Sequence, residues 1–145
     1  MMMKHPIAGS DTLLDRIKQA LTPNRLPLLI TIDGADGVGK SSLASWLAWQ
    51  LGMPAIQLDL YLTNLEPMQW LTADLNRVVS RRLDGGRPVI VDGVLALDAL
   101  DQIGRKTDFL VHVEGGTGIA LAAQITAYHS RQTRLADFAI AGYTD

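Results

Sequence analysis

The chain has 145 residues, of which 48% are hydrophobic and 19% are charged, and its formal net charge is −2. This length and composition are typical of one globular domain and exclude a disordered chain. The charge balance excludes a strongly basic, nucleic-acid-binding surface, and the absence of cysteine excludes disulfides, a thiol nucleophile and Cys-ligated zinc. We expect a single domain over residues 1–145, with residues 1–9 forming a flexible N-terminal tail.

The apolar segments are short. None approaches the roughly 18 consecutive residues that a membrane-spanning helix needs, and the N-terminus carries no apolar segment typical of a secretory signal. We therefore expect no membrane partner and a cytoplasmic location. The three histidines lie far apart in the sequence, and this spacing argues against a zinc hydrolase.

Strand-length apolar runs alternate with segments of helical period, a pattern typical of an α/β fold with a mainly parallel sheet. In chain order we expect a helix at 11–21, a strand at 28–33, a helix at 39–51, a strand at 55–58, a helix at 67–83, strands at 88–92 and 108–113, a helix at 117–129 and a strand at 137–141. These elements predict a five-stranded sheet flanked by helices.

The segment 34–41 reads Gly-Ala-Asp-Gly-Val-Gly-Lys-Ser and fits G-x-x-x-x-G-K-[ST] at every fixed position. Glycines let such a loop turn its N–H groups inward, and the following helix adds its N-terminal donors. Lys40 is expected to reach the β- and γ-phosphates of a nucleotide, and the Ser41 hydroxyl to ligate Mg²⁺. The expected nucleotide-binding residues are Gly34, Ala35, Asp36, Gly37, Val38, Gly39, Lys40, Ser41 and Ser42.

Acidic residues follow or end three of the expected strands. Asp92 ends the strand at 88–92 and is expected to help hold the hydrated Mg²⁺, although a strand-end Asp also accepts turn amides. Asp59 follows the strand at 55–58 and either takes the proton of an acceptor hydroxyl or caps a turn. Because ligands of parallel sheets bind beyond the carboxyl ends of the strands, Asp33, Asp59 and Asp92 are expected to converge there.

Two further acids belong to the loop region. Asp33 directly precedes the loop, and we favour a structural role, in which it accepts hydrogen bonds from loop amides, over contact with a substrate. Asp36 lies at a loop position with no required identity, so we expect its side chain to point outward, toward an acceptor. Turn chemistry alone also favours an Asp-Gly pair at this place.

Three segments together resemble the uridine kinase-like group of P-loop kinases: the loop at 34–41, Asp59-Leu60-Tyr61, and Val-Ile-Val-Asp-Gly-Val-Leu at 89–95. The resemblance covers most of the chain from about Leu13 onward. It implies a three-layer P-loop NTPase fold, ATP and Mg²⁺ as cofactors, and Asp59 acting on the acceptor hydroxyl. Tyr61 is the one aromatic ring beside Asp59 and is expected to contact the acceptor.

The sequence also departs from this family. Asp92 stands where the family often has Glu, and Leu60 and Leu62 replace polar or aromatic positions. Family members usually have an arginine-rich lid, whereas the segment 118–125 contains no basic residue. Arg131 and Arg134 are the nearest substitutes. They either offset charge on the transferring phosphoryl group or are solvated surface arginines.

These features predict an ATP- and Mg²⁺-dependent kinase that transfers the γ-phosphate to a hydroxyl of a small metabolite, and the resemblance implies a nucleoside as acceptor. One alternative is a nucleoside-monophosphate kinase, because the loop also resembles that of thymidylate kinase. The other is a nucleotide-binding module with little transfer activity, because the arginine lid is reduced. The expected partners are a nucleoside triphosphate and a small-molecule acceptor, and a homodimer stays open.

Overall fold

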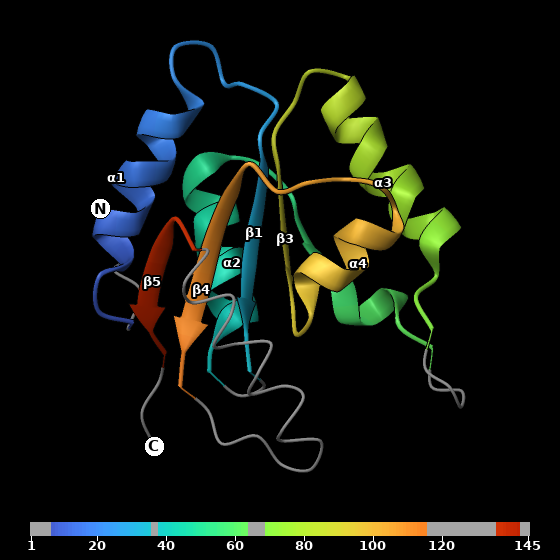
Figure 1. Ribbon diagram of the computed structural model, residues 1–145. Helices are drawn as coiled ribbons and strands as arrows, with labels where there is room; N and C mark the ends of the chain where they lie inside the picture. The colour runs from blue at the N-terminus through green and yellow to red at the C-terminus, as the bar shows by residue number, and fades with distance from the viewer. Residues whose placement is uncertain (1–6, 36–37, 64–68, 116–135, 143–145) are drawn as a thin grey trace.

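The computed structural model describes residues 7–35, 38–63, 69–115 and 136–142. Their strands form one sheet, in which every neighbouring pair is parallel. The strands are β1 (Leu29–Gly34), β2 (Ala55–Gln57), β3 (Val89–Gly93), β4 (Phe109–Glu114) and β5 (Phe138–Ala141). Their order across the sheet is β2-β3-β1-β4-β5, so β1 is central, as its wholly apolar beginning indicates (Figure 1). The predicted five-stranded sheet is confirmed.

Helices cover both faces of this sheet. The α-helices are α1 (Ser10–Leu21), α2 (Lys40–Leu51), α3 (Thr72–Asp84) and α4 (Ala96–Gln102), and a short 3₁₀ helix, η1 (Leu58–Tyr61), follows β2. Helices α1 and α2 pack on one face, and α3 and α4 pack on the other. The chain therefore has the predicted three-layer α/β architecture.

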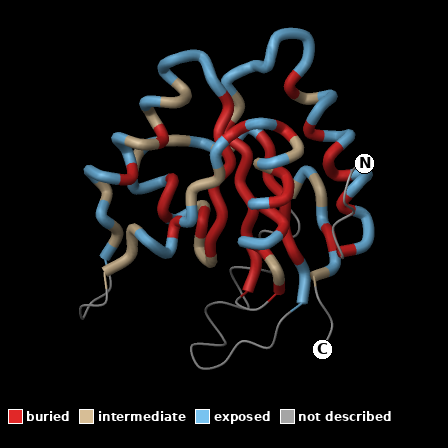
Figure 2. Tube along the Cα trace, turned by 180° about the vertical axis from the view of Figure 1, so that it is seen from behind, coloured by how far each residue is buried: buried red, intermediate tan, exposed pale blue. Residues whose placement is uncertain are grey.

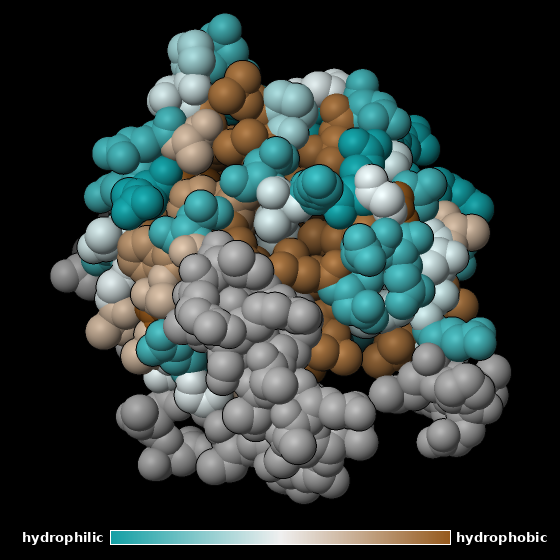
Figure 3. All heavy atoms as spheres, in the orientation of Figure 1, coloured by the Kyte–Doolittle hydropathy of each residue, from teal (hydrophilic) through white to brown (hydrophobic). Residues whose placement is uncertain are grey.

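Strand alternation divides the core into two parts. Successive side chains of a strand point to opposite faces, so Ile30 and Ile32 pack with α1 and α2, whereas Leu29 packs with α3 and α4. The strands at the centre of the sheet are buried on both faces (Figure 2). On the face seen in Figure 3, hydrophilic side chains lie over the helices and hydrophobic ones lie between them.

Two aspartates form hydrogen bonds between neighbouring strands near the amino ends of the strands. The Asp108 carboxylate accepts a hydrogen bond from the Leu29 N–H at 2.7 Å, and the Asp137 carboxylate accepts one from the Leu110 N–H at 2.8 Å. Each bond fixes the register of two adjacent strands. In the register of the sheet, Asp33 of β1 lies level with Gly93 of β3 and His112 of β4 at the carboxyl edge.

One expected helix begins later than predicted, and one helix was not predicted. The helix expected at 67–83 begins only at Thr72, because Leu62 and Trp70 form an antiparallel bridge and the Leu71 N–H donates to the Tyr61 carbonyl at 2.6 Å. This pairing leaves residues 69–71 outside the helix. Helix α4 was not expected from the sequence. The helix expected at 117–129 lies outside the described residues.

The predicted flexible tail at 1–9 includes residues that belong to the folded domain. Ile7 is 3% exposed and belongs to the core between the sheet and α1, and Gly9 caps α1. Residues 1–6 lie outside the described part of the chain. Within the described ranges, no helix combines the length and apolar character that crossing a membrane requires.

Candidate active site

The segment 34–41, which the sequence predicts to bind phosphate and which we call the phosphate loop, joins the central strand to the following helix: β1 ends at Gly34 and α2 begins at Lys40. Two of its glycines are required by the backbone. Gly34 has φ +156°, and a Cβ there would stand 2.6 Å from the carbonyl oxygen of Val113 on β4. Gly39 has φ +96° and directly precedes the first turn of α2. The expected loop residues Asp36 and Gly37 lie outside the described part.

The Lys40 side chain lies against the loop. Its side chain is 7% exposed, and Nζ donates to the carbonyl oxygen of Ala35 at 2.8 Å. Val38 is fully buried and anchors the middle of the loop in the core. Ser41 and Ser42 occupy the first turn of α2, where backbone N–H groups lack partners within the helix. The arrangement offers an ammonium group and helix N-terminal donors to an anion.

Asp92 lies beside this helix terminus, at the end of β3. The Ser41 hydroxyl donates to Asp92 Oδ1 at 2.9 Å, whereas Oδ2 is buried without a hydrogen-bond partner. Burial raises the pKa of Asp92, and the nearby charge of Asp59 raises it further, while the Ser41 hydrogen bond and the Lys40 charge lower it. Its free oxygen can accept hydrogen bonds from metal-bound water.

These residues fit a Mg²⁺ ion. In the described ranges, His, Asp and Glu side chains form no cluster of three that could hold a metal ion by themselves. Mg²⁺ typically keeps several waters and takes one or two protein oxygens together with substrate phosphates. The hydroxyl of Ser41 and the carboxylate of Asp92, next to the phosphate loop, are such a donor set.

Asp59 approaches the same edge of the sheet from η1. Its Oδ1 lies 3.5 Å from the point where a Cβ would stand on Gly93, the residue after Asp92. Leu58, which is fully buried, fixes η1 against β3, and half-buried Tyr61 packs on the same core. The structure thus brings Asp59 and Asp92 together, with Tyr61 two residues from Asp59.

Asp33 has a different environment from the one expected. Its side chain is 0% exposed, and Oδ1 lies 2.8 Å from His112 Nδ1 on β4. Its other oxygen has no hydrogen-bond partner. The expected bonds from loop amides to Asp33 are therefore wrong, and full burial does not support direct contact between Asp33 and a substrate. Sequence reasoning missed His112, because only the strand register places it beside Asp33.

The remaining expected site residues are not placed. Asp36, Arg131 and Arg134 lie outside the described residues, so their roles stay predictions. The same holds for the reduced lid that the segment 118–125 indicates.

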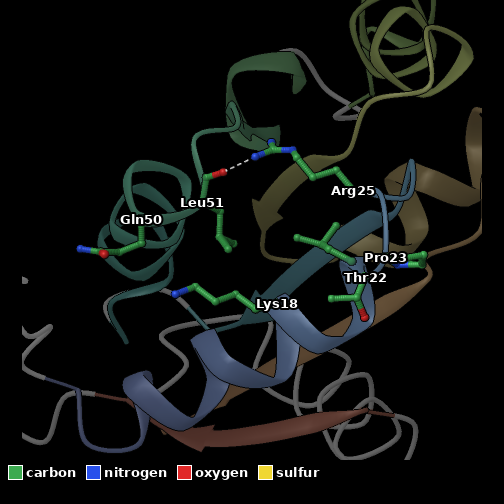
Figure 4. Close-up of a pocket in the computed structure, with 7 residues that line it drawn as sticks. Lys18, Thr22, Pro23, Arg25, Gln50 and Leu51 are labelled. Carbon is green, nitrogen blue, oxygen red and sulfur yellow. Dashed lines mark hydrogen bonds between the residues drawn. The ribbon is translucent and has the colours of Figure 1, made fainter.

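A separate cavity of about 250 Å³ lies at the other end of α2, lined by Lys18, Leu21, Thr22, Pro23, Arg25, Gln50 and Leu51 (Figure 4). Arg25 donates to the carbonyl oxygens of Leu51 at 2.7 Å and Gly52 at 3.2 Å. The guanidinium therefore offsets the negative end of the α2 dipole. We assign this cationic group a structural role.

No family model matches the chain, and no curated protein matches it. Among solved structures, a protein described as a possible uridine kinase from Bacillus stearothermophilus superposes with a TM-score of 0.60 and 16% identity, over 90% of this chain and 96% of that one. Shikimate kinase from Bacteroides thetaiotaomicron gives a TM-score of 0.42 and 14% identity, over 77% and 84% of the two chains. The first of these likenesses shows that the chain has the fold of a P-loop kinase.

Proposed function

We propose that this protein is an ATP- and Mg²⁺-dependent kinase that transfers the γ-phosphate to a hydroxyl of a small metabolite, most simply a nucleoside. The observation that carries the proposal is the hydrogen bond between Ser41 and Asp92, formed where the phosphate loop enters α2. It joins a phosphate-binding helix terminus to a carboxylate suited to Mg²⁺. The structural neighbour described as a possible uridine kinase supports a nucleoside as acceptor.

The chain's own residues would bind and orient the nucleotide. Lys40 would exchange its bond to the Ala35 carbonyl for the β- and γ-phosphates, while the loop amides and the start of α2 hold the remaining oxygens. Ser41 and Asp92 would hold Mg²⁺, directly and through water. When bound, this ion neutralises charge on the β- and γ-oxygens.

Asp59 would act on the acceptor. Its carboxylate would accept the hydroxyl proton as the acceptor oxygen bonds to the γ-phosphorus and the bond from that phosphorus to the β,γ-bridging oxygen breaks, which leaves ADP. Asp59 and Asp92 are close enough for their charges to interact, so the base would lie near the phosphates. Tyr61 and Asp36 would contact the acceptor, and Arg131 or Arg134 would offset charge on the transferring group.

The test is ADP release from Mg-ATP in the presence and absence of acceptors: nucleosides, nucleoside monophosphates and small alcohols. We expect a nucleoside to stimulate ADP release. Asp59→Asn should keep nucleotide binding and lower stimulated release by about a hundredfold, the scale of general-base catalysis. Asp101→Asn, an exposed acid on α4, is the matched control and should leave release unchanged.

The outcomes separate the alternatives. Stimulation by monophosphates rather than nucleosides would replace the proposal with a nucleoside-monophosphate kinase. Saturable Mg-ATP binding without stimulation by any acceptor would favour the nucleotide-binding module, as the lack of basic residues at 118–125 does. Unchanged turnover in Asp59→Asn would remove Asp59 as the base.

A further inference from the structure

We infer that Gly142, the residue that follows β5, is a positioning residue of the phosphate loop: because it has no side chain, the main chain of the loop lies directly against it at Val38. This inference rests on the proposed function, because it concerns how the same loop holds a nucleotide. Gly142 lies outside the sequence motif at 34–41 and outside the machinery described above.

Gly142 approaches the backbone of the loop as well as its side chains. A Cβ on Gly142 would stand 2.5 Å from the carbonyl oxygen of Val38 and 2.9 Å from the Val38 Cβ. Ordinary contacts of a Cβ are 3.4–4 Å long, and a close-packed interior has no spare volume for an added methyl group. A side chain at position 142 is therefore incompatible with the observed place of the Val38 carbonyl.

The need for glycine at position 142 is steric. Gly39 and Gly115, which also lie near Val38, have φ +96° and +108°, so their backbone alone favours glycine. The φ of Gly142 lies outside this left-handed range. An alanine could adopt the backbone conformation of Gly142, and the close approach of the loop is what excludes it.

The end of β5 is fixed from the side of the sheet. The Gly142 N–H donates to the carbonyl oxygen of Glu114 at 2.8 Å, which extends the pairing of β4 and β5 by one residue. Ile140, which is 4% exposed, packs in the core with α1 and α2. An added Cβ would also stand 3.0 Å from the Glu114 carbonyl oxygen, so it would be caught between β4 and Val38. We therefore expect the loop to yield.

A displaced Val38 carbonyl would change a phosphate-binding group. The carbonyl of Val38 and the N–H of Gly39 belong to one planar peptide unit, so the N–H turns when the carbonyl moves. Gly39 directly precedes α2, where loop amides must point inward to hold an anion. Binding groups need to be held within about 0.5 Å of their productive geometry. The contact with Gly142 thus sets the direction of the Gly39 N–H.

The experiment compares Mg-ATP affinity in wild type, Gly142→Ala and Gly104→Ala by calorimetric titration, with thermal unfolding of each nucleotide-free protein as the folding control. Gly142→Ala should weaken Mg-ATP binding by at least about tenfold, the scale of one lost charge-assisted hydrogen bond. Gly104→Ala has a strained φ of +70° and nothing within 4 Å of the added Cβ. It should lose stability and keep the wild-type affinity, which separates a displaced loop from general destabilisation.

A second measurement needs no nucleotide. The amide resonance of Gly39 in the NMR spectrum of the nucleotide-free protein reports the orientation of the peptide after Val38. We expect this resonance to shift in Gly142→Ala and to stay in place in Gly104→Ala. A role of Gly142 confined to β5 predicts shifts limited to β4 and β5, and an unchanged Gly39 resonance would overturn the inference.

The remaining outcomes are also defined. If Gly142→Ala does not fold, the double variant Val38→Gly/Gly142→Ala decides, because Val38→Gly removes the Cβ at 2.9 Å and frees the peptide to turn. The double variant should fold, and its failure to fold would overturn the inference. If the wild type does not bind Mg-ATP, the proposed function fails and the inference fails with it. Wild-type affinity in Gly142→Ala refutes the inference alone.

Discussion

The Ser41 hydroxyl donates to the Asp92 carboxylate at 2.9 Å, although 51 positions separate the two residues in the chain. This bond links the first turn of α2 to the end of β3, and therefore fixes the phosphate loop relative to the edge at which Asp59 lies. The other carboxylate oxygen of Asp92, Oδ2, is buried and has no hydrogen-bond partner. Buried polar atoms normally have one, so this oxygen can still accept a hydrogen bond from a ligand or from metal-bound water.

Asp92→Asn should lose phosphoryl transfer without losing stability. Burial raises the pKa of Asp92 above its ordinary 3.8, so between that value and the native pKa the folded protein binds more protons than the unfolded protein. The free energy of unfolding therefore falls as pH rises through this window, and the cost persists at neutral pH. Asparagine has no such cost. We expect an equal or higher Tm at pH near 7, and transfer lower by at least about tenfold.

The measurement is thermal unfolding of wild type and Asp92→Asn across the acid to neutral range. The difference in Tm should grow in favour of the variant as pH rises. A variant that is markedly less stable than the wild type at neutral pH would show that Asp92 stabilises the fold.

Gly34→Ala should disrupt the loop far more than a comparable change elsewhere. Its Cβ would meet the Val113 carbonyl oxygen at 2.6 Å, in addition to the strain of a positive φ. Gly104 has φ +70° and nothing within 4 Å of the place where a Cβ would stand, so Gly104→Ala supplies the matched control for strain alone. We expect about 1 kcal/mol of destabilisation in Gly104→Ala and clearly more in Gly34→Ala, by denaturant unfolding. Equal losses would mean that β4 accommodates the added carbon.

Leu47→Ala should test the core that supports α2. Leu47 is fully buried between α2 and the sheet, whereas Leu60, on η1, is 73% exposed. Truncation of a buried leucine leaves a cavity and costs about 2–5 kcal/mol. Leu60→Ala should cost less than about 0.5 kcal/mol. Denaturant unfolding measures both, and similar losses at the two positions would contradict the packing of α2 on the sheet.

Asp108→Ala should weaken the junction of β1 and β4. The carboxylate accepts the Leu29 N–H at 2.7 Å, and without it this amide at the start of the central strand loses its partner. The expected cost is about 1–3 kcal/mol. Asp108→Asn keeps an acceptor oxygen and should recover part of it. Hydrogen exchange at the Leu29 amide measures the effect locally, and unchanged protection in Asp108→Ala would contradict it.

The phosphate loop and the five strands could be predicted from the sequence because both depend on local patterns. Apolar runs of strand length mark buried parallel strands, and the glycines and Lys40 of the loop stand at fixed spacing between a strand and a helix. The place of Asp92 beside Ser41 also followed, since a P-loop needs a carboxylate at the end of a neighbouring strand.

The features that the sequence did not predict depend mainly on contacts between segments that are distant in the chain. The Asp33–His112 pair joins residues 79 positions apart, and only the register of β1 and β4 makes them neighbours. The predicted start of α3 was wrong because the bridge between Leu62 and Trp70 keeps residues 69–71 out of the helix. Helix α4 spans only seven residues, too few for an amphipathic period to be distinguished.

The central claim is that residues 34–41 bind the polyphosphate of a nucleotide, and titration of Mg-ATP into wild type and Lys40→Ala tests it most directly. Lys40→Ala removes the one ammonium group held against the described part of the loop. We expect saturable binding to the wild type and an affinity at least about fiftyfold lower in the variant, the scale of a charge-assisted hydrogen bond to phosphate. The absence of a saturable signal from the wild type, or equal Mg-ATP affinity in the two proteins, would contradict the claim that residues 34–41 bind the polyphosphate.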